Sequence, residues 1–204
     1  LLLALGIGAP LGVFMAMRRD HPLSRIGMGF VLAGQSLPTF WSGVLLILVF
    51  AVTLGWLPAS GARAPDSVII PAICLSLLSM ATFARVARTA VLDELSKPYI
   101  RAARAKGLSM GQVVRRHALR NSAIPVISIA ALEIANLLSG AVIVETVFAW
   151  PGLGQLTIQS IAARDFPIVQ AIVLLGAFVS IFLNLAADLL YSAVDPRIRL
   201  EGGR

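Results

Sequence analysis

The residues Tyr99-Ile-Arg-Ala-Ala-Arg-Ala-Lys-Gly-Leu-Ser109 form a short basic stretch inside a chain that is otherwise strongly apolar. Pro98, just before it, suits the first position of a helix, because its missing N–H would be unpaired there anyway. Gly107 suits the left-handed residue that ends a helix. Ser109 and Gln112 match the S-x-x-Q capping box, which predicts a second helix start. The stretch therefore predicts two short helices joined at Gly107.

The composition shows what surrounds this stretch. Of the 204 residues, 58% are hydrophobic and only 13% are charged, whereas a soluble domain carries about 25% charged residues. So few charges cannot cover a surface that faces water. We predict an all-α membrane protein, a polytopic helical bundle that forms one domain over residues 1–204. The net charge of +7 is typical of basic cytoplasmic loops.

Five segments are predicted to cross the membrane, since a helix needs about 20 apolar residues to do so. They are 1–17, 26–56, 68–83 with its continuation to Arg88, 123–148 and 166–194. Lys and Arg gather in the first and third loops and in the tail, whereas the other loops hold only Arg63 and Arg164. The positive-inside rule therefore predicts that the first loop, the third loop and the tail are cytoplasmic.

The third loop resembles the coupling loop, or EAA loop, of permease subunits of binding-protein-dependent ATP-binding cassette (ABC) importers. The residues that match the family pattern in register are Ala102, Ala103, Gly107 and Leu119. The residues that depart from it are Arg101, His117 and Arg120. With these departures the loop resembles that of the dipeptide, oligopeptide and nickel branch of the family. Four further stretches of the chain also resemble this branch, namely 34–41, 55–61, 144–154 and 188–197.

The resemblance implies the fold of a type I ABC importer permease in a prokaryotic plasma (inner) membrane. It implies a further amino-terminal span before Leu1, where the chain starts inside an apolar run. The implied partners are a paralogous permease, two cytoplasmic ATP-binding subunits, an external solute-binding protein and membrane lipid. The implied solutes are peptides or a related small solute, such as a nickel chelate or glutathione. No cofactor is expected on this chain, because ATP and Mg²⁺ would be bound by the ATPase partners.

We expect residues 93–121 to form the coupling loop, with an apolar helix face that fits a groove in the ATPase. The residues expected at this contact are Arg101, Ala102, Ala103, Gly107, Leu108, Val113, His117, Leu119 and Arg120. One alternative is a solvated basic loop that touches anionic lipid. Another is a helix-turn-helix DNA reader, but apolar segments tether the loop at both ends, so we expect no nucleic-acid partner.

Polar residues inside spans are costly and tend to face a pathway or a partner helix. The residues predicted to line a translocation path are Gln35, Ser36, Glu133, Asn136 and Ser139. The alternative is hydrogen bonding between helices without solute contact. Pro38 follows two of these residues and favours a bend in the second span.

Residues 149–167 are predicted to be external, with a short amphipathic helix over 153–163. This helix would be an anchor in the membrane interface. The family resemblance implies a second role, as part of an outer gate and of the docking surface for the binding protein.

The sequence argues against an enzyme, because it contains no G-x-S-x-G, H-E-x-x-H or Walker A motif. Cys74 is the only cysteine, so an internal disulfide is excluded, and no metal site is expected. Two rival functions remain open. One is a secondary transporter driven by protons through Glu133, and the other is a membrane-tethered regulator that binds DNA.

Overall fold

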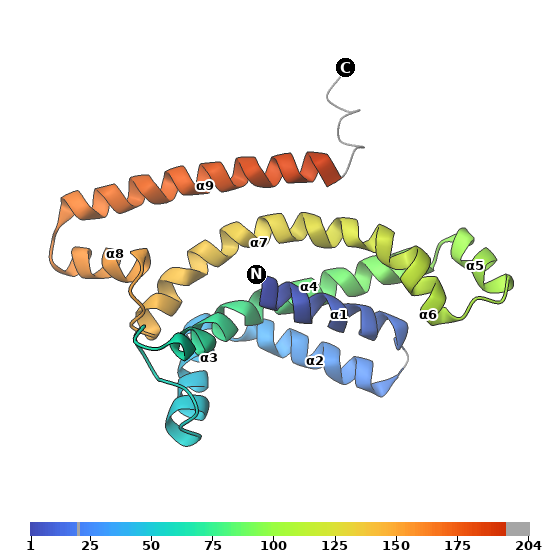
Figure 1. The fold of residues 1–204 in the computed structure, drawn as a ribbon, viewed down its shortest axis with the longest axis horizontal. Coiled ribbons are helices and arrows are strands. Elements are labelled where there is room, and N and C mark those ends of the chain that lie inside the picture. Colours follow the sequence, from blue (N-terminus) through green and yellow to red (C-terminus); the bar gives the residue numbers. More distant parts are fainter. Residues whose placement is uncertain (20, 195–204) are drawn as a thin grey trace, which may run out of the picture.

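The computed structural model describes residues 1–19 and 21–194, and within them it is helical without strands (Figure 1). The elements in chain order are α1 (Leu2–Met17), α2 (Pro22–Ser36), α3 (Thr39–Leu46), the π-helix η1 (Ile47–Thr53), the 3₁₀-helix η2 (Pro65–Val68), α4 (Ile69–Leu95), α5 (Pro98–Ala105), α6 (Met110–Val113), the π-helix η3 (Val114–Ala118), α7 (Leu119–Val147), α8 (Leu153–Ala162) and α9 (Phe166–Val194). The predicted all-α class is confirmed.

Helix α4 is the central element, because each of the three apolar core clusters contains its side chains. Phe83 of α4 packs with Ala4 of α1 and Val126 of α7, and Cys74 packs with Val144 of α7. Helix α7 lies between α4 and α9 (Figure 1). The long helices α4 and α7 therefore form the frame that positions the loops at their ends.

Helix α1 lies unusually close to α4, and glycine makes this possible. A Cβ on Gly12 would lie 2.2 Å from the carbonyl oxygen of Ala84, and one on Gly8 would lie 2.5 Å from that of Met80. These two glycines are four residues apart on α1, which is the small-residue spacing that lets membrane helices approach closely. The first predicted span is thus fixed to the third by backbone contact.

The predicted second span, 26–56, is wrong as a single helix. Helix α2 ends at Ser36, and Leu37 has an extended backbone (φ −84°, ψ 129°) before Pro38. A residue before proline is driven out of the helical region by the proline ring. The chain then turns by 107° into α3 and η1, so the bend that Pro38 predicts becomes a complete break.

Length and composition alone support fewer spans than predicted. Among the described residues two helices are long and apolar enough to cross a membrane, 65–95 and 166–186, or three if the bent pair counts as one span. Helix α1 is apolar but has only 16 residues. Helix α7 lies at the position of the predicted span 123–148 and has 29 residues. The number five therefore stays a prediction.

The loop between α4 and α7 contains both predicted short helices, but the second one does not end. Helix α6 continues through η3 directly into α7. The basic residues of 115–120 therefore lie inside a continuous helix. We refer below to residues 98–113, which comprise α5, the turn at Gly107 and α6, as the hairpin.

Candidate functional site

The turn of the hairpin is built by local sequence. Gly107 has a φ of +87°, the left-handed region that residues with a Cβ rarely adopt. The Ser109 N–H donates to Gln112 Oε1 at 2.9 Å, and the Gln112 N–H donates to Ser109 Oγ at 3.4 Å. Both features confirm what the sequence predicts, and they fix the direction in which α6 leaves the turn.

The predicted contact residues of the coupling loop fall into two groups by how exposed each residue is. The exposed residues are Arg101, Ala102, Gly107 and Arg120, and the half-buried ones are Ala103, Leu108, His117 and Leu119. Val113 is the exception, because it is fully buried, as are Val114 and Ala118 of the adjoining η3. The predicted apolar face thus packs onto the protein itself, with η3 against α4, and Val113 supports the hairpin from within.

A buried carboxylate holds the base of the hairpin. Glu94, near the end of α4, is 5% exposed and accepts hydrogen bonds from Tyr99 Oη, from Asn121 Nδ2 at 2.8 Å and from Lys97 Nζ at 2.5 Å. Partial burial and the adjacent Glu94 carboxylate raise the pKa of the Tyr99 hydroxyl, so this phenol stays protonated and donates. The ends of α4, α5 and α7 are joined through this one side chain.

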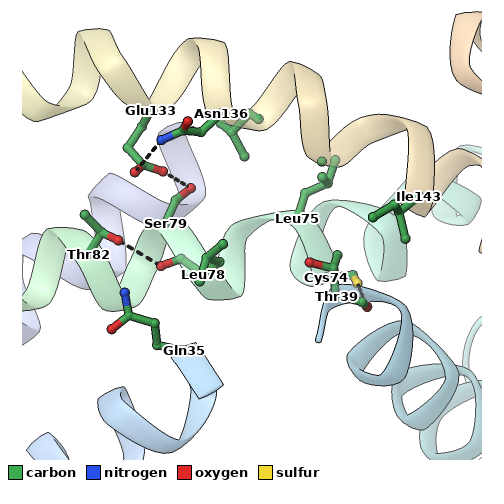
Figure 2. Close-up of a pocket in the computed structure, with 12 residues that line it drawn as sticks. Gln35, Thr39, Cys74, Leu75, Leu78, Ser79, Thr82, Glu133, Asn136 and Ile143 are labelled. Carbon is green, nitrogen blue, oxygen red and sulfur yellow. Dashed lines mark hydrogen bonds between the residues drawn. The ribbon is translucent and has the colours of Figure 1, made fainter. Parts of the chain in front are cut away.

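A second polar cluster lies between the long helices. Glu133 of α7 is 7% exposed, and its two carboxylate oxygens accept from different donors. Ser79 Oγ of α4 donates to Oε2, and Asn136 Nδ2 donates to Oε1 at 3.3 Å. Figure 2 shows the three side chains meeting between α4 and α7.

Glu133 and Asn136 share a cavity of about 540 Å³ with Gln35, at the break between α2 and α3 (Figure 2). Its other polar lining residues are Thr39, Cys74, Ser79 and Thr82, and its apolar ones are Leu75, Leu78, Leu137, Gly140 and Ile143. Three of the five predicted path residues therefore meet in one space. Ser36 does not join them, because its hydroxyl donates to Leu32 O at 3.0 Å on its own helix. Ser139 belongs to α7, and its side chain lies outside the described part of the structure.

Sequence reasoning missed the contribution of α4 to this cavity. Ser79 and Thr82 are three residues apart in an apolar helix, a spacing that puts side chains on neighbouring positions of one face. The hydrogen bond that the Arg85 guanidinium donates to Gln35 Oε1 was not predicted either. The spacing in α4 could have revealed the first feature, whereas the second depends on how α2 packs on α4.

At the far end of α7, a third carboxylate fixes α8. Glu145 Oε2 accepts from the backbone N–H of Gly154 at 2.7 Å and of Gln155 at 3.2 Å. These are unpaired donors of the first turn of α8, and a carboxylate there is also favoured by the helix dipole. The helix predicted over 153–163 is observed as α8, and it packs on both α7 and α9.

Fold and site together define a class of protein: the helical membrane component of a transport system, with a structured basic hairpin between two long helices and a polar cavity inside the bundle. The family model described as "Binding-protein-dependent transport system inner membrane component" matches residues 8–200, and the chain belongs to this family. The predicted family and its location in the inner membrane are thereby confirmed.

Two relatives show the degree of similarity. The glutathione transport system permease protein GsiC of Salmonella choleraesuis (strain SC-B67) is 42% identical over 194 residues, which cover 95% of this chain and 63% of that protein. GsiC of Escherichia coli (strain K12) is 43% identical with the same coverage. The chain thus spans 63% of the length of these curated relatives, and both relatives are named as permeases.

Two solved structures share the fold. An inward-facing MetNI methionine ABC transporter superposes with a TM-score of 0.77 at 23% identity, covering 94% of this chain and 88% of that chain. An amino acid ABC transporter with histidines gives a TM-score of 0.70 at 19% identity, covering 94% and 87%. At these identities the likeness shows the fold, which is that of ABC transporter permeases.

Proposed function

We propose that this chain is the permease subunit of an ATP-driven importer, and that its solute is a small peptide of the glutathione type. The family supports the transport role, and relatives named as glutathione permeases support the solute class. The observation that carries the proposal is the hairpin, whose exposed basic surface is tied to two long helices through Glu94.

The hairpin, within the coupling loop 93–121, is the docking site for a cytoplasmic ATPase subunit. Its exposed residues offer both charge and close approach: Arg101 is a cation on a long stem, while Ala102 and Gly107 leave room for a partner's backbone. A movement of α5 reaches α4 and α7 together, because Glu94 bonds to residues at the start of α5 and α7. ATP binding would thereby shift the permease between two states through differential contacts.

The remaining partners follow from this role. A paralogous permease completes the pathway, two ATPase subunits bind the two coupling loops, and an external binding protein delivers the solute. This chain is not itself an enzyme and needs no cofactor of its own, since ATP and Mg²⁺ are bound by the ATPase subunits. The cavity with Gln35, Glu133 and Asn136 is its part of the translocation path, and Ser139 of α7 is assigned to the same path.

The test is copurification and uptake with the full-length protein and its Ala102→Trp variant. Ala102 is exposed, so the indole leaves the fold intact but obstructs a partner. We expect an ATPase subunit to copurify with the wild type in mild detergent, and to be lost from the variant while permease levels in the membrane are unchanged. Uptake that needs no ATPase and is abolished by an uncoupler would instead establish proton-driven transport through Glu133.

A further inference from the structure

The cavity of about 540 Å³ contains a carboxylate without a counter-charge. Glu133 is 7% exposed, and within the described residues its partners are the neutral side chains Ser79 and Asn136. Burying a carboxylate is costly unless a cation pairs with it. Because both neutral partners donate to it, one on each oxygen, they orient the carboxylate as an acceptor. The cluster thus holds the carboxyl group of Glu133 in place, with no cation beside it among the described residues.

The cavity that contains the Glu133 carboxyl group also contains a hydrogen-bond donor, the side-chain amide of Gln35. Arg85 has only donors, so its bond to Gln35 must use the amide oxygen of Gln35. The amide nitrogen of Gln35 is therefore left available, and Figure 2 shows it directed toward Thr82 on the cavity side, away from the amide oxygen. The Arg85 contact fixes Gln35 as a donor to whatever occupies the cavity.

These features select a chemical class of ligand. A volume of about 540 Å³ is in the range of small-molecule sites, and the wall between the polar groups is apolar, with Leu75, Leu78 and Ile143. A bare metal ion does not fit, because the described residues contain no group of three or more His, Cys, Asp or Glu side chains that could hold one. An organic monocation with a neighbouring acceptor group satisfies both ends.

We propose that this cavity recognises the free ammonium group of the transported solute, with Glu133 as its ion-pair partner and the Gln35 amide donating to a carbonyl or carboxylate oxygen of the same solute. This inference rests on the proposed function. It adds a selection step in the permease itself, separate from selection by the binding protein. A solute whose amino group is blocked would leave Glu133 buried and unpaired in the cavity.

The experiment uses the complete transporter in proteoliposomes, with its ATPase subunits and binding protein. The probes are S-methylglutathione, which has a free ammonium group and no thiol, and its N-acetyl derivative. Uptake is measured for the wild type, for Glu133→Gln and Glu133→Asp, and for Ser128→Ala as a control. Ser128 lies on the same helix, and its hydroxyl bonds to the backbone of that helix.

We expect Glu133→Gln to lower S-methylglutathione uptake about 10-fold or more, since hydrogen bonds to charged groups are worth that factor. Glu133→Asp retains the charge and should keep more uptake than Glu133→Gln, and Ser128→Ala should resemble the wild type. ATPase stimulation by the loaded binding protein should be unchanged in Ser128→Ala. Wild-type uptake by Glu133→Gln would overturn the inference, whereas absence of ATP-dependent uptake in the wild type would overturn the proposed function and the inference with it.

A second measurement decides the matter if Glu133→Gln fails to assemble. Cys74 lines the same cavity and is the only cysteine of this chain, so its alkylation rate in the wild-type transporter reports occupancy. S-methylglutathione should slow alkylation of Cys74, and N-acetyl-S-methylglutathione at the same concentration should not. Equal protection by both probes, or by neither, would overturn the role of the ammonium group.

Discussion

The carboxylate of Glu94 accepts a hydrogen bond of 2.8 Å from the side chain of Asn121, although the two residues are 27 positions apart in the chain. Everything between them is the hairpin and its connection to α7. The bond closes this segment into a loop whose two ends meet at one point. A movement of the hairpin away from α4 therefore also displaces the start of α7.

Replacement of Glu94 by alanine should loosen this closure. The change removes the acceptor of Tyr99 and leaves Asn121 with only its 3.2 Å bond to Tyr99 Oη, and we expect the free energy of unfolding to fall by about 1–3 kcal/mol. The measurement is the fraction of monodisperse protein after heating in detergent. Asp93→Asn is the matched control, because Asp93 is an exposed neighbouring carboxylate. Equal thermal stability of the two variants would show that Glu94 does not stabilise this closed segment.

Replacement of Gly107 by valine should distort the turn. The left-handed conformation costs about 1–2 kcal/mol for a residue with a Cβ, and Gly107 holds a φ of +87°. We expect reduced copurification of the ATPase subunit from membranes that contain normal amounts of the permease. Gly111→Ala is the control, because Gly111 lies in α6 with open space around its Cβ position, and it should retain the ATPase.

Replacement of Gly12 by leucine should separate α1 from α4. Any Cβ at this position collides with the Ala84 carbonyl at 2.2 Å, and overpacking of this kind costs about 1–3 kcal/mol. The same substitution at Gly6, on the same helix, meets nothing within 4 Å and should be tolerated. Thermal denaturation of the two variants in detergent measures the difference, and equal stability would contradict the close contact.

Replacement of Glu145 by alanine should free the start of α8. We expect the amides of Gly154 and Gln155 to exchange with deuterium about 10-fold faster, because they lose their charged acceptor. Exchange at the centre of α7 should be unaffected. Thr146→Val serves as the control, since the Thr146 hydroxyl donates to the carbonyl of Val142 on its own helix. Unchanged amide exchange in Glu145→Ala would show that the cap does not hold α8.

Local chemistry was readable from the sequence, and packing was not. Gly107 and the box of Ser109 and Gln112 depend on neighbouring residues, so the hairpin turn could be predicted. The break at Pro38 was expected as a bend, but its size depends on how α3 packs against α4 and α7. The sequence analysis separates the second short helix from the span that begins at 123, whereas the structure continues one helix through η3 into α7, since no glycine or proline interrupts residues 112–124.

The candidate cavity also combines features that neighbouring residues predict with features that only packing creates. Glu133 and Asn136 were predicted together because they are three residues apart on one helix face. Ser79 is 54 positions away from Glu133, and only the packing of α4 on α7 brings it there. The burial of Val113 was likewise invisible, since an apolar stripe on a loop helix fits a partner's groove as well as it fits the protein's own surface.

The π-helical turn η3, between the hairpin and α7, has a consequence for register. A π-turn contains one more residue than an α-turn, and one residue corresponds to about 100° of rotation around a helix axis. Because the wider π-turn absorbs this extra residue, deleting one residue within Val114–Ala118 would restore regular winding and leave the hairpin on the same side of α7, whereas deleting one residue from the regular part of α7 would rotate it by about that angle. The π-turn thus lets the chain hold one extra residue between the hairpin and α7 without turning the hairpin away.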